Sequence, residues 1–102
     1  METRFEWDPA KANRNRRKHG VSFETALRAF ADPFALSELE RIEEGEQRWR
    51  TLGLVEGHIL LVVAHTLRDE EGDDGQSVEV IRIISARAAD RTERRRYEQE
   101  NR

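Results

Sequence analysis

The stretch Ser77 to Arg87 reads Ser-Val-Glu-Val-Ile-Arg-Ile-Ile-Ser-Ala-Arg, and it predicts a β-strand that carries charge. Valine and isoleucine are strong β formers, and polar residues bound the run on both sides. Arg82 interrupts the apolar run and Arg87 ends it. An arginine between isoleucines reaches an edge, pairs with a carboxylate, or lies on a face that meets an anion. The stretch therefore predicts either structural arginines or a cationic sheet surface.

The composition predicts one small domain with a thin core. Only 36% of the 102 residues are hydrophobic, while 38% are charged. There is no cysteine, which excludes disulfides and thiolate chemistry, and no apolar run approaches the ~18 residues of a membrane span. The N-terminus is acidic and mixed, unlike a secretory signal. We expect a cytoplasmic protein with a single domain over residues 1–102.

The charges are segregated along the chain. Cations gather in residues 11–19 and 91–96, whereas acids gather in residues 38–46 and 69–74. The net charge of −3 argues against a nucleic-acid binder, but the segregation permits one anionic and one cationic partner. Nearly all cations are arginine, which suits bidentate contact with phosphate or carboxylate. The alternative is that the segregation only keeps the fold soluble.

Cap and turn signals predict the order helix, helix, four strands, helix. Helices are expected over residues 9–18, from Ser22 to Asp32, and from Asp90 to about Glu100. Strands are expected over residues 34–39, 47–55, 58–65 and 77–87, and residues 5–7 alternate like a short edge strand. Short connections favour an antiparallel meander. The predicted fold is α+β, with two N-terminal helices, a four-stranded antiparallel sheet and a C-terminal helix.

The motifs and reactive residue types in the sequence exclude several kinds of catalytic or metal site. There is no glycine-rich phosphate loop and no His-Glu-x-x-His motif, and the three histidines are scattered at positions 19, 58 and 65. We therefore expect neither a metal nor another cofactor.

Arginines on the predicted strands are the remaining signal. If Arg48, Arg50, Arg82 and Arg87 converge, they form a surface suited to a phosphodiester. Cleavage of RNA without metal needs a base for the ribose 2′-hydroxyl, an acid for the leaving oxygen, and cations for the charge on the phosphorane. His65, at the end of the third predicted strand, is the first candidate for the base because an unperturbed imidazole titrates near neutrality. Glu46 is an alternative base, and Tyr97 is a candidate hydrogen-bond or proton donor.

Each of these residues also has a structural explanation. His65 is equally suited to the end of a strand, and the ring of Tyr97 is suited to packing on the sheet. Arg48 and Arg50 can pair across strands with Glu38 or Glu79.

Six motifs occur in order and cover nearly the whole chain. They are Phe5-Glu6-Trp7-Asp8-x-x-Lys11, Lys18 to Glu24, Phe30-Ala31-Asp32-Pro33, Glu46-x-Arg48, Arg82 to Arg87, and Glu93-Arg94-Arg95-x-Tyr97-Glu98. Together these motifs resemble the BrnT toxins of bacterial type II toxin-antitoxin systems. The acidic stretch of residues 69–76 is longer than in family members.

This resemblance implies a RelE-like fold and a ribonuclease that arrests translation. It implies a BrnA-like antitoxin, a heterotetramer of two toxins and two antitoxins, and operator DNA bound only through the antitoxin. The expected catalytic residues are Glu46, Arg48, His65, Arg82 and Arg87, and the expected RNA-binding residues are Arg50, Ser85, Tyr97 and Arg94. The alternative is a non-catalytic module that binds a partner and contributes to an operator-bound repressor complex.

Overall fold

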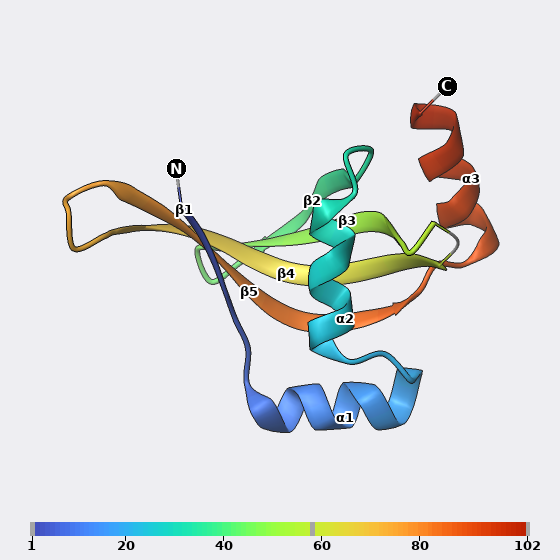
Figure 1. The fold of residues 1–102 in the computed structure, drawn as a ribbon, viewed down its shortest axis with the longest axis horizontal. Helices are drawn as coiled ribbons and strands as arrows, with labels where there is room; N and C mark the ends of the chain where they lie inside the picture. Colours follow the sequence, from blue (N-terminus) through green and yellow to red (C-terminus); the bar gives the residue numbers. More distant parts are fainter. Residues whose placement is uncertain (1, 58, 102) are drawn as a thin grey trace.

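The computed structural model describes residues 2–57 and 59–101. Their elements are, in chain order, β1 (Glu2–Glu6), α1 (Pro9–His19), α2 (Phe23–Leu27), the 3₁₀ helix η1 (Arg28–Ala31), β2 (Leu36–Glu43), β3 (Glu46–Val55), β4 (Ile59–Glu71), β5 (Ser77–Ala88) and α3 (Arg91–Glu100). His58, which we expected to begin the third strand, lies outside the described residues. Figure 1 shows the strands as one curved sheet with helices on both sides.

The sheet is mixed and has five strands, so the predicted four-stranded antiparallel sheet is wrong. The strand order is β1-β5-β4-β3-β2, and β1 lies parallel to β5 at one edge. Phe5 lies opposite Ile81, and Glu6 lies opposite Arg82. Because almost the whole chain separates β1 from β5, no tight turn joins them, and no local signal identifies this pairing.

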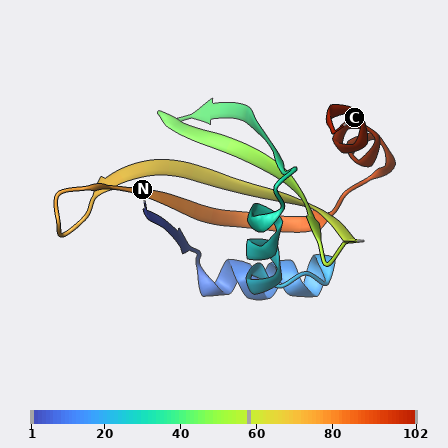
Figure 2. The ribbon, with the colours of Figure 1, turned by 45° about the horizontal axis from the view of Figure 1, so that its top comes forward.

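One face of the sheet carries the main core. Phe23, Ala26 and Ala29 from α2 and η1 are fully buried against Val63 and Ile83 of the central strands. Figures 1 and 2 show α2 lying across this face. Contact between η1 and β3 is so close that a Cβ on Gly53 would lie 2.2 Å from the carbonyl oxygen of Ala29. Glycine at position 53 therefore sets the distance between the helical layer and the sheet.

Helix α1 covers the edge of β5 beyond the end of β1. Asn15, which is 6% exposed, donates to the carbonyl of Ala86 at 2.8 Å and accepts from its amide at 3.0 Å. This side-chain amide replaces a neighbouring strand and satisfies backbone groups that would otherwise be buried without partners. The helix begins at the N-cap Asp8 and ends at Gly20, whose φ is +72°. The predicted helix over residues 9–18 is thus confirmed to within one residue.

The hairpin of β4 and β5 is longer than predicted. Strand β4 continues to Glu71, so residues 69–71 of the acidic stretch 69–76 are paired strand. The tip of the hairpin extends past the other strands (Figure 1). In the described part of the chain, no helix is long and apolar enough to cross a membrane.

Candidate active site on the arginine face

The second face of the sheet gathers the predicted arginines. Directly paired residues on neighbouring strands project to the same side of a sheet. One row across the sheet contains Arg82 of β5, Thr66 of β4 and Arg48 of β3. The next row contains Ala64, with Ser85 on one side and Arg50 on the other. Arg87 belongs to the same face, opposite Val62. We call this surface, defined by Arg48, Arg50, Arg82 and Arg87, the arginine face.

A β-bulge brings Arg82 and Arg87 to the same face. In a regular strand, residues five positions apart point to opposite sides because side chains alternate. Here Ala64 pairs with Ser85 while His65 pairs with Ile83, which leaves Ile84 as an extra residue in β5. The extra residue shifts the alternation by one. The bulge is therefore what allows arginines of opposite parity to act on one ligand.

Each arginine of this face has a carboxylate partner. The distances between nitrogen and oxygen are 3.2 Å for Arg48–Glu46, 3.2 Å for Arg50–Glu93, 3.8 Å for Arg82–Glu6, and 2.8 Å for Arg87–Glu93. The arginine side chains nevertheless remain 30–43% exposed. A phosphate can therefore reach them from solvent, in competition with the carboxylates.

Glu93 links α3 to two of the arginines. It accepts from both terminal nitrogens of Arg87 at 2.8 and 2.9 Å, and from Arg50 at 3.2 Å. It also accepts from the amide of Asp90 at 2.9 Å, completing a capping box at the start of α3. The hydrogen bond from Arg87 lowers the pKa of this carboxyl, which is nearly buried. Glu93 is thus a fixed anion that orients Arg50 and Arg87.

Thr66 lies at the centre of the face and was missed by the sequence analysis. It is 2% exposed and lies between Arg48 and Arg82 in register. Among the residues that the structure describes, neither its hydroxyl nor the buried Nε of Arg48 has a hydrogen-bond partner. Buried polar atoms without partners cost free energy, so their presence here points to a surface completed by a ligand or water. A threonine in an apolar strand gives no sequence signal of such a role.

His65 lies on the other face of the sheet, away from the arginines. It is 2% exposed, shares a 2.7 Å hydrogen bond with the Thr51 hydroxyl, and packs edge-on against Phe30. Burial lowers the pKa of its imidazole. The structure therefore does not bring His65 together with Arg48, Arg82 and Arg87.

Tyr97 and Arg94 both lie on α3. The Tyr97 hydroxyl donates to Asp32 at 2.5 Å, and its ring packs against a small apolar cluster that includes Leu52. Burial, together with the Asp32 carboxylate, raises the pKa of the phenol to about 12. Tyr97 thus holds α3 against the sheet, whereas Arg94 is exposed to solvent.

Glu46 and Glu6 are two of the carboxylates around the face, and Glu38, which lies opposite Arg50 at 3.7 Å, is another. Glu6 accepts from Arg68 at 2.7 Å, and this hydrogen bond lowers its pKa. Glu46 contacts Arg48, and its side chain is 47% exposed. Within the described residues, Glu46 forms one ion pair, whereas Glu6 forms two.

A substrate phosphate is the ligand that suits this arrangement. Four guanidinium groups on one face provide bidentate donors and positive charge for a phosphodiester. Among residues 2–57 and 59–101, no cluster of three or more histidines and carboxylates has the arrangement of a metal site.

Comparison with known proteins identifies the family of the chain. Over residues 7–93 the chain matches the family described as ribonuclease toxin, BrnT, of type II toxin-antitoxin system. The fold is similar to the crystal structure of the Brucella abortus ribonuclease toxin BrnT, at 21% identity and a TM-score of 0.51, with 89% of this chain and 100% of that one covered. No curated protein gives a significant match. Because the family match spans most of its length, the chain belongs to the BrnT family of ribonuclease toxins of type II toxin-antitoxin systems.

Proposed function

We propose that this ribonuclease toxin cleaves RNA on the arginine face, between Arg48 and Arg82. The observation that carries the proposal is the row in which these two arginines flank the unpartnered Thr66 hydroxyl, with Arg87 brought to the same face by the bulge at Ile84. Arg48, Arg82 and Arg87 bind the scissile phosphate and stabilise the added negative charge of the phosphorane. Arg50 and Ser85 contact neighbouring parts of the RNA.

The chemistry is a transfer within the RNA itself. The ribose 2′-oxygen attacks phosphorus as it loses its proton, the bond to the 5′-oxygen breaks, and the leaving oxygen takes up a proton. The products are a 2′,3′-cyclic phosphate and a free 5′-hydroxyl. Because arginines supply the positive charge at the phosphate, the reaction proceeds without a metal ion.

Glu46 is the residue we propose for the proton of the 2′-hydroxyl. It lies beside Arg48, and its carboxylate has no second cation to hold it. Glu93 is less suited to this role because Arg50, Arg87 and its own helix cap already use its oxygens. His65 would need to cross the sheet to reach the arginines.

Cleavage of labelled single-stranded RNA in the presence of a chelator tests the proposal. Arg82→Ala is expected to lose about 10²–10³ in rate, as when one preorganised donor to a developing oxyanion is removed. Arg82→Lys keeps the charge but loses the bidentate geometry, so partial activity is expected. Glu46→Gln tests the proposed base in the same assay.

The control is Arg28→Ala, which removes an exposed arginine paired with Glu56 away from the arginine face. Arg82 is 43% exposed, and its only ion pair with a described residue is 3.8 Å long, so its removal is expected to leave the fold intact. Equal cleavage rates for Arg82→Ala, Arg28→Ala and the unmodified chain would reject the site.

A type II toxin has a protein antitoxin, and we propose that this one is BrnA-like. The support is family membership together with the motifs that resemble BrnT toxins. The proposed complex holds two toxins and two antitoxins and contacts operator DNA through the antitoxin. It acts in the cytoplasm, where the RNA substrate is translated. The mass of the complex after coexpression with the neighbouring open reading frame tests the stoichiometry.

A further inference from the structure

Helix α1 carries a second group of cations that have no acidic partner. Within the described residues, Lys11, Arg14, Arg16, Arg17 and Lys18 form no ion pair, and α1 contains no acid. All but Lys11, which is half-buried, are exposed. The helix dipole favours cations in the last turn of α1. It only partly accounts for this group of cations, because Arg14 lies four residues before Lys18 and the two side chains repel each other.

This contrasts with the arginine face, where every arginine is paired with a carboxylate. A paired arginine must give up its partner to bind phosphate, so its net gain from binding is small. An unpaired cation binds phosphate and releases condensed counterions from the nucleic acid, which is the main source of affinity for RNA. Affinity for RNA therefore has to come from cations outside the arginine face.

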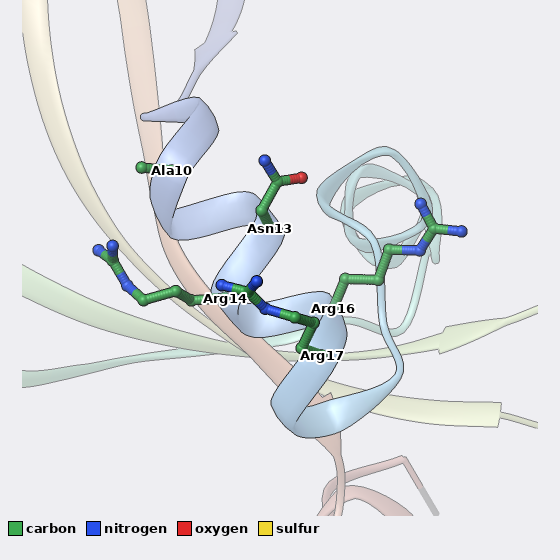
Figure 3. A pocket seen from close by; sticks show the side chains of 5 residues that line it. All are labelled: Ala10, Asn13, Arg14, Arg16 and Arg17. Atoms are coloured by element: carbon green, nitrogen blue, oxygen red, sulfur yellow. The ribbon is translucent and has the colours of Figure 1, made fainter.

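One flank of α1 leads directly to the candidate site. Lys11, Arg14 and Lys18 line a shallow hollow of about 300 Å³ together with Ser85, whose strand neighbours belong to the arginine face. These three cations share a flank because they lie three, four and seven residues apart. Figure 3 shows Arg14 and Arg16 on opposite sides of the helix, with Arg17 between them.

We infer that the flank of α1 bearing Arg14 and Lys18 is an RNA-binding track that guides the phosphate backbone of single-stranded RNA past Ser85 to the arginine face. The inference rests on the proposed function, which places the scissile phosphate on that face. RNA is favoured over operator DNA because Ser85 lines the hollow and also belongs to the row of the sheet that contains Arg50 of the arginine face. Arg16 lines a hollow with Glu24, and it shares a further hollow with Arg14 and Arg17 on the outer surface of the helix. Neither of these hollows contains Lys18 or Ser85.

Two double variants of the same helix test the track. Arg14→Gln with Lys18→Gln removes two cations from the flank beside Ser85, and Arg16→Gln with Arg17→Gln removes two from the rest of the helix. All four residues are exposed, so both variants are expected to fold. The probe is a fluorescent single-stranded 2′-O-methyl oligonucleotide, which has no free 2′-hydroxyl and cannot be cleaved. Its binding is measured by anisotropy over a series of salt concentrations.

Loss of two phosphate contacts lowers the slope of log K against log salt by about 1.4 for single strands. We expect this change for the Arg14/Lys18 variant and a change below about 0.5 for the Arg16/Arg17 variant. Equal changes in both would overturn the inference, because they would show an unspecific effect of charge. An unchanged slope in the Arg14/Lys18 variant, with weakened binding of the antitoxin, would also overturn it and would assign the flank to an acidic partner.

The two proposals fail in distinguishable ways. One case is that the track is absent but the arginine face is the site. Natural RNA is then still cleaved and Arg82→Ala still loses cleavage, while the slopes of log K against log salt are equal for the two double variants. If the arginine face is not the site, Arg82→Ala cleaves normally, although the Arg14/Lys18 variant still loses its share of the salt dependence.

Discussion

Replacing Glu93 by glutamine tests how the fold positions the arginines. The carboxylate accepts three guanidinium hydrogen bonds, from Arg87 at 2.8 and 2.9 Å and from Arg50 at 3.2 Å. A hydrogen bond to a charged group contributes about 1.5–3 kcal/mol. Both arginine side chains are at least 33% exposed, so water replaces part of the lost interaction, and the glutamine oxygen still accepts. The expected loss in the free energy of unfolding is therefore about 2–3 kcal/mol, well below the sum.

Urea denaturation followed by circular dichroism measures this loss, and a thermal melt is expected to shift by about 8–24 °C. The matched control is Glu43→Gln, whose exposed pair with Arg41 contributes at most about 1 kcal/mol. The sign of the pH dependence provides a second check. Because the folded pKa of Glu93 is lowered, its stabilisation is present above about pH 4.5 and is lost as the pH falls through the lowered value. Equal losses for the two variants, or a difference that does not decrease as the pH falls below about 4.5, would refute the positioning role.

Three further predictions concern the framework of the site. Gly53→Ala brings a methyl group against the backbone of η1, 2.2 Å from the Ala29 oxygen, and is expected to cost about 1–3 kcal/mol in urea denaturation. Tyr97 is the single tyrosine, so a pH titration followed by absorbance at 295 nm should show its phenol ionising with a midpoint near pH 12. Asp32→Asn should lower the midpoint of this titration. Because burial lowers the folded pKa of His65, stability is expected to fall as the pH drops below about 6.5, by at most ~1.4 kcal/mol per pH unit, and His65→Gln should flatten this dependence.

Local signals in the sequence predicted most of the elements. Asp8-Pro9 and Gly20 mark α1, and Asp90 with Glu93 marks the start of α3, because caps act within one turn of a helix. The motifs that resemble BrnT toxins led to the family that the comparison confirmed. Four of the five strands follow from runs of β-branched and apolar residues.

The remaining features depend on contacts between distant parts of the chain. The pairing of β1 with β5 joins segments that are far apart in the sequence. The burial of Asn15 against β5 depends on where β1 ends. The bulge at Ile84 leaves no mark in the strand sequence, so the sequence alone could not decide whether Arg82 and Arg87 share a face. The sequence predicts His65 at a strand end, but the side of the sheet on which it lies depends on the strand register, and a shift of one residue inverts that side.

The distribution of ion pairs assigns different tasks to the two groups of cations. If the arginine face carried four unpaired arginines, it would bind any phosphate tightly, and tight binding of the ground state does not lower the barrier to cleavage. In the proposed function, its carboxylates weaken ground-state binding and hold Arg50 and Arg87 in position, so that their charge takes effect when the phosphorane forms. In the same proposal α1 supplies affinity, because its cations need no fixed geometry to attract a flexible strand. Mutations on α1 should therefore change KM and its salt dependence, whereas mutations of Arg82 or Glu93 should change kcat.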